Sequence, residues 1–224
     1  MIANIANALA ILLGTALGRL IGLRLPVRLT DHLLQALGLG ILVTGASMAL
    51  EGDKLFLTVL SLILGAALGE MLNLEGLLEH LGRRLEKRLG ATQGEVGQSF
   101  VAATLLYCVG AMAITGALEA GLNHNYTILY IKSLLDGTLA VILATRWGIG
   151  VGLSAFSVLA YQGGLTLGAA WIAPYLQPKT VQEITATGGI LIVAIALNLL
   201  EIRKFKVGNL LPAILVAAVL VNLW

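Results

Sequence analysis

The sequence predicts an all-α fold, a polytopic bundle of about eight transmembrane helices, and three observations support this prediction. Of the 224 residues, 58% are apolar and 12% are charged, whereas roughly a quarter of the residues of a soluble domain are charged. The apolar residues occur in runs that short charged or turn segments separate. The 27 glycines suit membrane helices, in which small residues let two backbones approach. We therefore expect one integral membrane domain, residues 1–224, in contact with the lipid bilayer.

The apolar runs define the expected spans. An untilted crossing needs roughly 20 apolar residues, and several runs are shorter, so a bundle of six or seven spans is the alternative. The first residues contain no Lys or Arg of the kind that begins a cleaved signal peptide, so we expect the first helix to be retained. The eight expected spans cover residues 5–23, 33–50, 55–72, 98–118, 127–145, 149–173, 184–201 and 207–223.

The basic residues predict the orientation, because the cytoplasmic loops of membrane proteins are rich in Lys and Arg. With eight spans and the N-terminus outside, only Lys54 and Lys179 fall on the outer side, and Lys132 remains within the membrane. The other eleven basic residues fall on the cytoplasmic side: Arg19, Arg24, Arg28, Arg83, Arg84, Lys87, Arg88, Arg146, Arg203, Lys204 and Lys206.

Residues 75–90, between the third and fourth spans, predict an amphipathic helix on the cytoplasmic surface. Five leucines fall on one helical face, and basic residues on the other can approach anionic lipid. The leucines are Leu77, Leu78, Leu81, Leu85 and Leu89.

Short strings recur along the chain and suggest internal repeats. In the first repeat, Leu-Gly14-Thr-Ala-Leu-Gly18 is similar to Leu-Gly65-Ala-Ala-Leu-Gly69, which suggests that residues 5–50 and 55–118 are tandem helix pairs. The second relates residues 55–145 to residues 149–223, because Ser133-Leu-Leu-Asp136-Gly137 returns as Asn209-Leu-Leu-Pro212-Ala213. Three spans per unit would invert the second copy, which is a transporter architecture with its site near the bilayer midplane. Similar strings also recur by chance in membrane helices, so an array without symmetry is the alternative.

Two charges inside the span 127–145 are the main functional lead. Asp136 lies roughly 14 Å along this helix at 1.5 Å per residue, which is near the midplane. Ionisable residues at this depth usually face a bundle interior and mark an ion, proton or substrate path. Lys132 lies one helical turn away. It is either the counter-charge of Asp136 or a side chain that reaches the outer interface.

Other polar side chains complete the candidate site. The glycine-rich span 149–173 predicts a helix bent near its middle, which would bring Gln162 level with Asp136, alongside Thr104, Tyr107 and Cys108. Three further polar residues, on the expected inner approach, are candidates for gating or for hydrogen bonds between helices. They are Glu70, Asn198 and Asn209.

Several function classes find no support in the sequence. It has no basic patch with interleaved aromatic residues of the kind that binds nucleic acid, no phosphate-binding Gly-Lys-Ser/Thr loop and no Gly-x-Ser-x-Gly elbow. We therefore expect neither an enzyme nor an organic cofactor. The single Cys108 excludes an internal disulfide and a Cys-based zinc site, and the sequence leaves open whether another metal binds.

The sequence resembles a known family over its whole length. The strings that carry the resemblance are Phe100-Val-Ala-Ala-Thr-Leu-Leu-Tyr-Cys-Val-Gly-Ala-Met-Ala-Ile114, Lys132-Ser-Leu-Leu-Asp-Gly137, Tyr161-Gln-Gly163, Asn209-Leu-Leu-Pro212 and Leu13-Gly-Thr-Ala-Leu-Gly18. They are similar to the YqgA/YdfK-like bacterial inner-membrane proteins, the domain of unknown function 554. The resemblance implies a multi-pass protein of the bacterial inner membrane, in a family often guessed to contain transporters.

Two functions remain open. In the first, the chain is a transporter or channel for a small ion or solute, with its site around Asp136. In the second, it is a noncatalytic assembly or regulatory subunit in which Lys132 and Asp136 form a structural ion pair. Glycine-rich helix faces could build a homo-oligomer in either case.

Overall fold

The computed structural model describes residues 1–22, 26–78, 80 and 96–223, and these residues form helices without a strand among them. The prediction of an all-α membrane fold is thus confirmed, and each of the eight expected spans contains a helix. In chain order the elements are α1 (Ile2–Gly22), α2 (Val27–Ala49), α3 (Leu55–Met71), α5 (Val96–Cys108), α6 (Ala111–Leu122), α7 (Thr127–Trp147), α8 (Ile149–Leu167), α9 (Ala169–Ile172), α10 (Pro178–Leu199), the 3-10 helix η1 (Val207–Leu210) and α11 (Pro212–Leu223).

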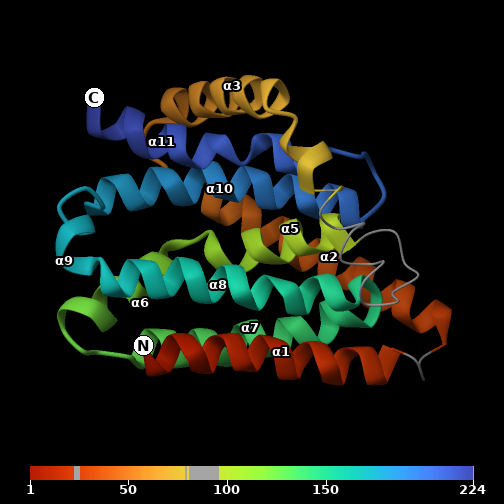
Figure 1. The fold of residues 1–224 in the computed structure, drawn as a ribbon. Coiled ribbons are helices and arrows are strands. Elements are labelled where there is room, and N and C mark those ends of the chain that lie inside the picture. The colour runs from red at the N-terminus through yellow and green to blue at the C-terminus, as the bar shows by residue number, and fades with distance from the viewer. Residues whose placement is uncertain (23–25, 79, 81–95, 224) are drawn as a thin grey trace.

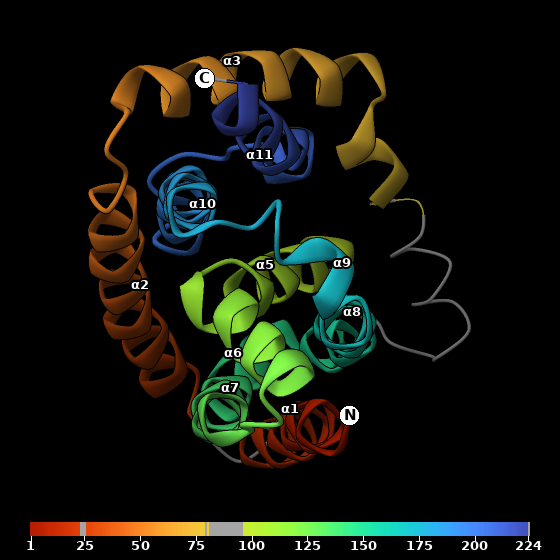
Figure 2. The same ribbon diagram turned by 90° about the vertical axis from the view of Figure 1, so that its left-hand side faces the viewer.

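Most long helices lie side by side with roughly aligned axes (Figure 1). Seen end-on, α7, α8, α10 and α11 form the body of the bundle with α5 and α6 among them, while α2 and α3 run across its outside (Figure 2). Large apolar side chains such as Leu13, Phe56 and Leu134 are exposed on the outer faces. This surface suits contact with lipid chains.

Contacts between helix ends show that successive spans alternate in direction. A Cβ at Gly22 would meet Thr145, and one at Gly150 would meet Val96, so one end of the bundle holds the last turns of α1 and α7 and the first turns of α5 and α8. At the opposite end, Gly163 of α8 lies beside Met1. We call these the Arg146 end and the Met1 end. Which end faces the cytoplasm stays a prediction.

Helix length and composition alone identify fewer candidate membrane spans than the eight expected. Among the described residues, five helices are long and apolar enough to span a membrane, α1, α2, α7, α8 and α10, and the bent pair of α5 and α6 would make a sixth. The helix α3 and the segment Val207–Leu223 are shorter apolar helices. The exact span count and the internal repeats therefore remain predictions.

A break interrupts the fourth span. The axes of α5 and α6 differ by 60°, and Gly110 between them has φ 134°, a conformation that glycine adopts at low cost. A Cβ at Gly188 of α10 would overlap the Val109 side chain, so this side chain fills the notch that glycine leaves. We expected a bend near the middle of residues 149–173 instead, and this was wrong. The helix α8 runs without a break from Ile149 to Leu167, past Gly163 and Gly164.

Two glycine pairs allow close helix contacts. Cβ atoms at Gly14 and Gly18 of α1 would overlap the carbonyl oxygens of Gly137 and Val141 in α7, and we call this contact the α1–α7 seam. A Cβ at Gly65 of α3 would likewise overlap backbone atoms of Ala213 at the start of α11, and one at Gly69 would overlap the backbone of Asn209 in η1. We call this contact the α3–α11 seam. Backbones this close are the known effect of small residues spaced by four.

The expected amphipathic helix 75–90 falls mostly outside the described residues. Residues 74–78 and residue 80 are helical, which agrees with its first turn. Residue 79 and residues 81–95 are not described.

Candidate functional site

The helix α7 carries a buried ion pair. Lys132 and Asp136 are one turn apart, and the Lys132 Nζ lies 2.9 Å from Asp136 Oδ1 and 2.7 Å from Oδ2. The two residues are 6% and 5% exposed. The sequence allowed two positions for the Lys132 side chain, and in the structure it is the counter-charge of Asp136. Because removing either charge would leave the other buried and unpaired, the two are energetically coupled.

Two amides from neighbouring helices complete this site. Asn7 of α1 donates from Nδ2 to Asp136 Oδ2 at 3.0 Å and to Gln162 Oε1 of α8 at 3.1 Å. Both amide residues are fully buried. We call Asn7, Lys132, Asp136 and Gln162 the polar core. Gln162 thus joins Asp136 as expected from the sequence, although it does so through Asn7 and from an unbent helix.

Several buried polar atoms of the polar core and of helix α5 have no hydrogen-bond partner among the described residues. They are Asn7 Oδ1, Gln162 Nε2, Tyr107 Oη and Thr104 Oγ1. Most buried polar groups in proteins are hydrogen-bonded, and exceptions commonly mark a bound water or ion. The site therefore has unused capacity both to donate and to accept hydrogen bonds.

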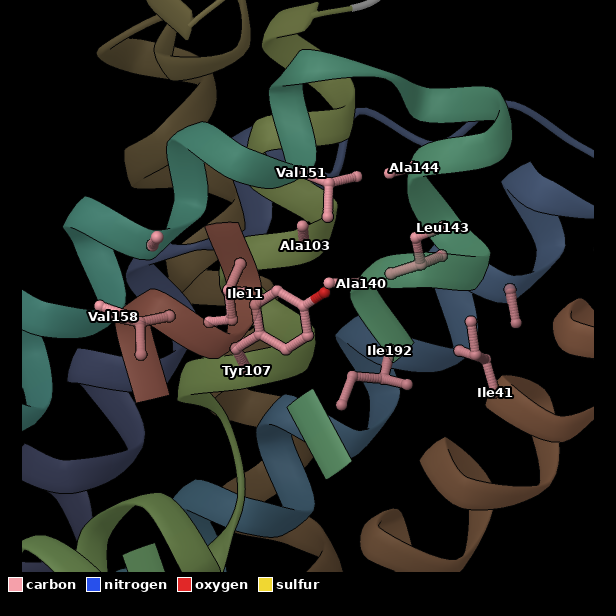
Figure 3. Close-up of a cluster of buried hydrophobic side chains, with 13 residues drawn as sticks. Ile11, Ile41, Ala103, Tyr107, Ala140, Leu143, Ala144, Val151, Val158 and Ile192 are labelled. Atoms are coloured by element: carbon pink, nitrogen blue, oxygen red, sulfur yellow. The ribbon is translucent and has the colours of Figure 1, made fainter. Parts of the chain in front are cut away.

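The helix α5 approaches the ion pair from the side of its break. Asp136 acts electrostatically on Tyr107, and Lys132 and Asp136 both act on Cys108. Tyr107 is fully buried, and its hydroxyl points toward Ala140 of α7 (Figure 3). Thr104 lies one turn before Tyr107 and Cys108 on the same helix. The five polar residues expected at the centre from the sequence thus come from α5, α7 and α8.

Apolar side chains separate the polar core from the Arg146 end. They include Ile11, Leu143 and Val151, which belong to one buried cluster with Tyr107 and Ile192 (Figure 3). We call this cluster the apolar layer. Because Arg146 follows Asp136 by ten residues on α7, about 15 Å of helix separate them.

A cavity of about 680 Å³ lies beyond the apolar layer, at the Arg146 end. Its lining combines apolar residues with polar residues of both charges, which include Asp31, Glu75, Arg146, Asn198, Glu201 and Lys204. Asp136 is not among the lining residues. The polar core is therefore closed toward this cavity in the conformation observed.

The three residues expected on the inner approach lie away from Asp136. Asn198 closes the turn after α10, since its amide donates to Phe205 O at 2.9 Å and its Oδ1 accepts from Phe205 N at 2.7 Å. Asn209 Nδ2 donates to Glu70, and its Oδ1 accepts from Glu75 N at 2.7 Å. Only Asn198 of the three lines the cavity.

Sequence reasoning missed two groups of polar residues. Asn4 and Asn7 are buried on one face of α1, where Asn4 donates to Thr166 Oγ1 at 3.0 Å. Two amides three residues apart in an apolar helix were the available signal. The second is Glu183 of α10, which is 4% exposed and accepts hydrogen bonds from Lys54 N and Thr58 Oγ1 at 2.8 and 3.2 Å. It fastens the start of α3 to α10 at the Met1 end.

Comparison with known proteins places the chain among membrane proteins. A family model described as "Protein of unknown function (DUF554)" matches residues 2–222. The chain is 31% identical over 225 residues to "Uncharacterized membrane protein YdfK" of Bacillus subtilis (strain 168), covering 99% of this chain and 96% of that protein. It is 34% identical to "Uncharacterized protein YqgA" of Escherichia coli (strain K12), covering 97% and 95%. No solved structure shows significant similarity.

Proposed function

This chain belongs to the DUF554 family, and because that membership brings no activity with it, we propose from the geometry of the polar core that the chain is a transporter or channel for a small ion or solute. The observation that carries this proposal is the buried pair of Lys132 and Asp136, surrounded by polar atoms that lack partners. Charges at this depth are costly and are usually retained for a path. In this proposal the protein is not an enzyme.

The proposed path has three parts. The polar core is the binding site, the apolar layer is a closed barrier, and the cavity at the Arg146 end is a vestibule. Since the apolar layer separates the core from the cavity, the structure corresponds to a state closed on that side. Opening would require the helices around Tyr107 to move, and the break at Gly110 gives α5 and α6 a place to bend. We place the protein in the bacterial inner membrane, with Arg146 on the cytoplasmic side.

The short contacts within the buried ion pair favour a second function, that of an assembly or regulatory subunit. The contacts of 2.7 and 2.9 Å and the burial of both residues also fit a structural pair in an assembly or regulatory subunit. The two functions differ in what happens when both charges are replaced. Apolar pairs often replace buried ion pairs without loss of stability, so the structural function predicts that a double apolar variant still works.

Ion flux into reconstituted vesicles tests the proposal. We would record currents on solid-supported membranes after concentration jumps of alkali chlorides, ammonium chloride, phosphate and amino acids. Wild type should respond to at least one of these. Asp136→Asn and the double variant Lys132→Met/Asp136→Leu should both lose the response while remaining folded. Thr138→Val, an exposed position on α7, is the matched control and should keep it. A response that survives in the double variant would favour the structural function instead.

A further inference from the structure

The Lys132 ammonium occupies the position in which a metal cation would bind a carboxylate. Its Nζ is within 3 Å of both Asp136 oxygens, which is the bidentate arrangement of carboxylates around hard cations. The ammonium therefore shows where positive charge is stabilised in the polar core. An ammonium group and an alkali ion carry the same charge, so either one can balance the negative charge of the Asp136 carboxylate.

The surroundings of Asp136 are rich in uncharged oxygen atoms. Asn7 Oδ1 and Tyr107 Oη have no hydrogen-bond partner among the described residues, and Gln162 Oε1 accepts a single bond, from Asn7. One carboxylate with amide and hydroxyl oxygens suits a hard cation of low charge. The titratable groups that face Asp136 are Lys132 on its own helix and Tyr107 and Cys108 of α5, while α1 and α8 contribute the Asn7 and Gln162 amides.

Lys132 lies near the Met1 end of its helix. It is the sixth residue of α7, so its Cα lies about 8 Å along the helix from the first residue at the Met1 end. A lysine side chain near a helix end can extend its ammonium toward the interface while its stem stays in apolar surroundings. The interfacial position that the sequence also allowed is therefore within reach of the Lys132 ammonium.

We propose that Asp136 binds a monovalent inorganic cation, Na⁺, K⁺ or Li⁺, in exchange for the Lys132 ammonium, which is a built-in competitor for the site. This inference rests on the proposed function, since it names the ligand class of the same site. It gives Lys132 a role that a purely structural pair lacks. The ammonium holds the site closed and electrically balanced while no ion is bound, and a binding ion must displace it.

The variant Lys132→Met tests this exchange, because it removes the competitor and leaves Asp136 to be balanced by an ion. We would measure the melting temperature of the purified full chain in NaCl, KCl, LiCl or choline chloride at equal ionic strength. At least one alkali ion, at about 100 times its dissociation constant, should raise the melting temperature of Lys132→Met by about 5 °C over choline. Wild type should shift less at the same concentration, and Lys132→Met/Asp136→Leu should not shift.

Three results would overturn the inference. The first is a Lys132→Met protein that no alkali ion stabilises over choline. The second is an equal shift in the double variant, which lacks the carboxylate. The third is failure to recover folded Lys132→Met from cells, since cells supply K⁺ that should fill the site. Flux measurements separate this inference from the proposed function. If flux depends on Asp136 but alkali ions do not change the melting temperature, the proposed transport function holds and the cation inference fails. If alkali ions raise the melting temperature but no flux is found, the site is a structural cation site and the transport function fails.

Discussion

The α1–α7 seam and the α3–α11 seam share one packing device but differ in what they enclose. Each uses two glycines four residues apart to bring a helix against the backbone of a partner. In the first, Gly14 and Gly18 meet successively later residues of α7, so the helices are parallel. In the second, Gly65 and Gly69 meet Ala213 and then Asn209, so α3 and the segment that leads into α11 are antiparallel.

The charges beside the two seams have very different surroundings. The side chains of Lys132 and Asp136, beside the α1–α7 seam, are 8% and 7% exposed at a separation of 2.7 Å. Those of Lys206 and Glu70, beside the α3–α11 seam, are 68% and 66% exposed at 3.6 Å. The energetic weight of a charge pair rises steeply as water is excluded. The comparison teaches that the same glycine packing can lie beside a buried charge pair or a solvated one, and the proposed function rests on the buried pair beside the first seam.

The largest expected effect is the loss of the α1–α7 seam. Gly14→Leu would force the side chain into the Gly137 carbonyl, and since neither backbone can move without separating the helices, we expect little folded protein in detergent extracts. Gly69→Leu should detach α3 from η1 while leaving the polar core assembled. The yield of folded protein and the ion flux into reconstituted vesicles distinguish the two variants. Gly40→Leu is the control, because a Cβ at Gly40 meets nothing within 4 Å. Equal loss of flux in Gly69→Leu would contradict the distinction between the seams.

The next effect compares the two charge pairs. Asp136→Leu leaves the Lys132 ammonium without a partner at its buried position, which should lower the free energy of unfolding by up to about 3–5 kcal/mol, and by less if the ammonium extends to the interface. Adding Lys132→Met should restore most of this loss. Glu70→Leu removes a solvated pair and should cost less than about 1 kcal/mol. Thermal unfolding in detergent of the single and double variants measures all three. If the double variant is as unstable as Asp136→Leu, the instability does not come from the unpaired ammonium.

A smaller effect is expected at the amides of the two seams. Asn7→Leu removes the donor to Asp136 and Gln162 and should lower the free energy of unfolding by about 1–3 kcal/mol, since the Gln162 carbonyl is left buried without its partner. Asn209→Leu also removes two hydrogen bonds, but water can replace its bond to the exposed Glu70. We expect a cost of about 1 kcal/mol there. Flux should fall only in Asn7→Leu, and a fall in both would place Asn209 on the path as well.

The sequence predicted the parts of this structure that follow from single residues. Asp136 and Lys132 stood out because charges are rare in apolar helices, and the glycine pairs of both seams followed from their spacing. Asn7 was missed because its importance depends on α1 lying against α7 and α8, which local patterns do not encode. Glu183 was missed because it lies just before an expected span. The bend was predicted in the wrong helix because glycine content shows only where a helix can break. The break that is observed, between α5 and α6, is accompanied by the contact of Val109 with Gly188 of α10, which the sequence does not reveal.

The smallest effect concerns a third glycine pair, Gly164 and Gly168, which has the same spacing of four residues as the other two. A Cβ at Gly164 meets nothing within 4 Å, and one at Gly168 meets the side chain of Ile172 and the carbonyl of Gly164, both from its own segment. Within one chain, Gly164→Leu should therefore change stability by no more than about 0.5 kcal/mol.

The same variant tests the predicted homo-oligomer. If a second copy packs on the α8 face that holds Gly164, leucine there would separate the copies, because small residues at such interfaces let helices approach. The native mass in detergent, measured by light scattering for wild type and Gly164→Leu, decides this. An oligomer in wild type and a monomer in the variant would give the third pair the packing role of the other two, between chains instead of within one. An unchanged mass and melting temperature would leave Gly164 as a lipid-facing residue, and the glycine spacing there would carry no packing function.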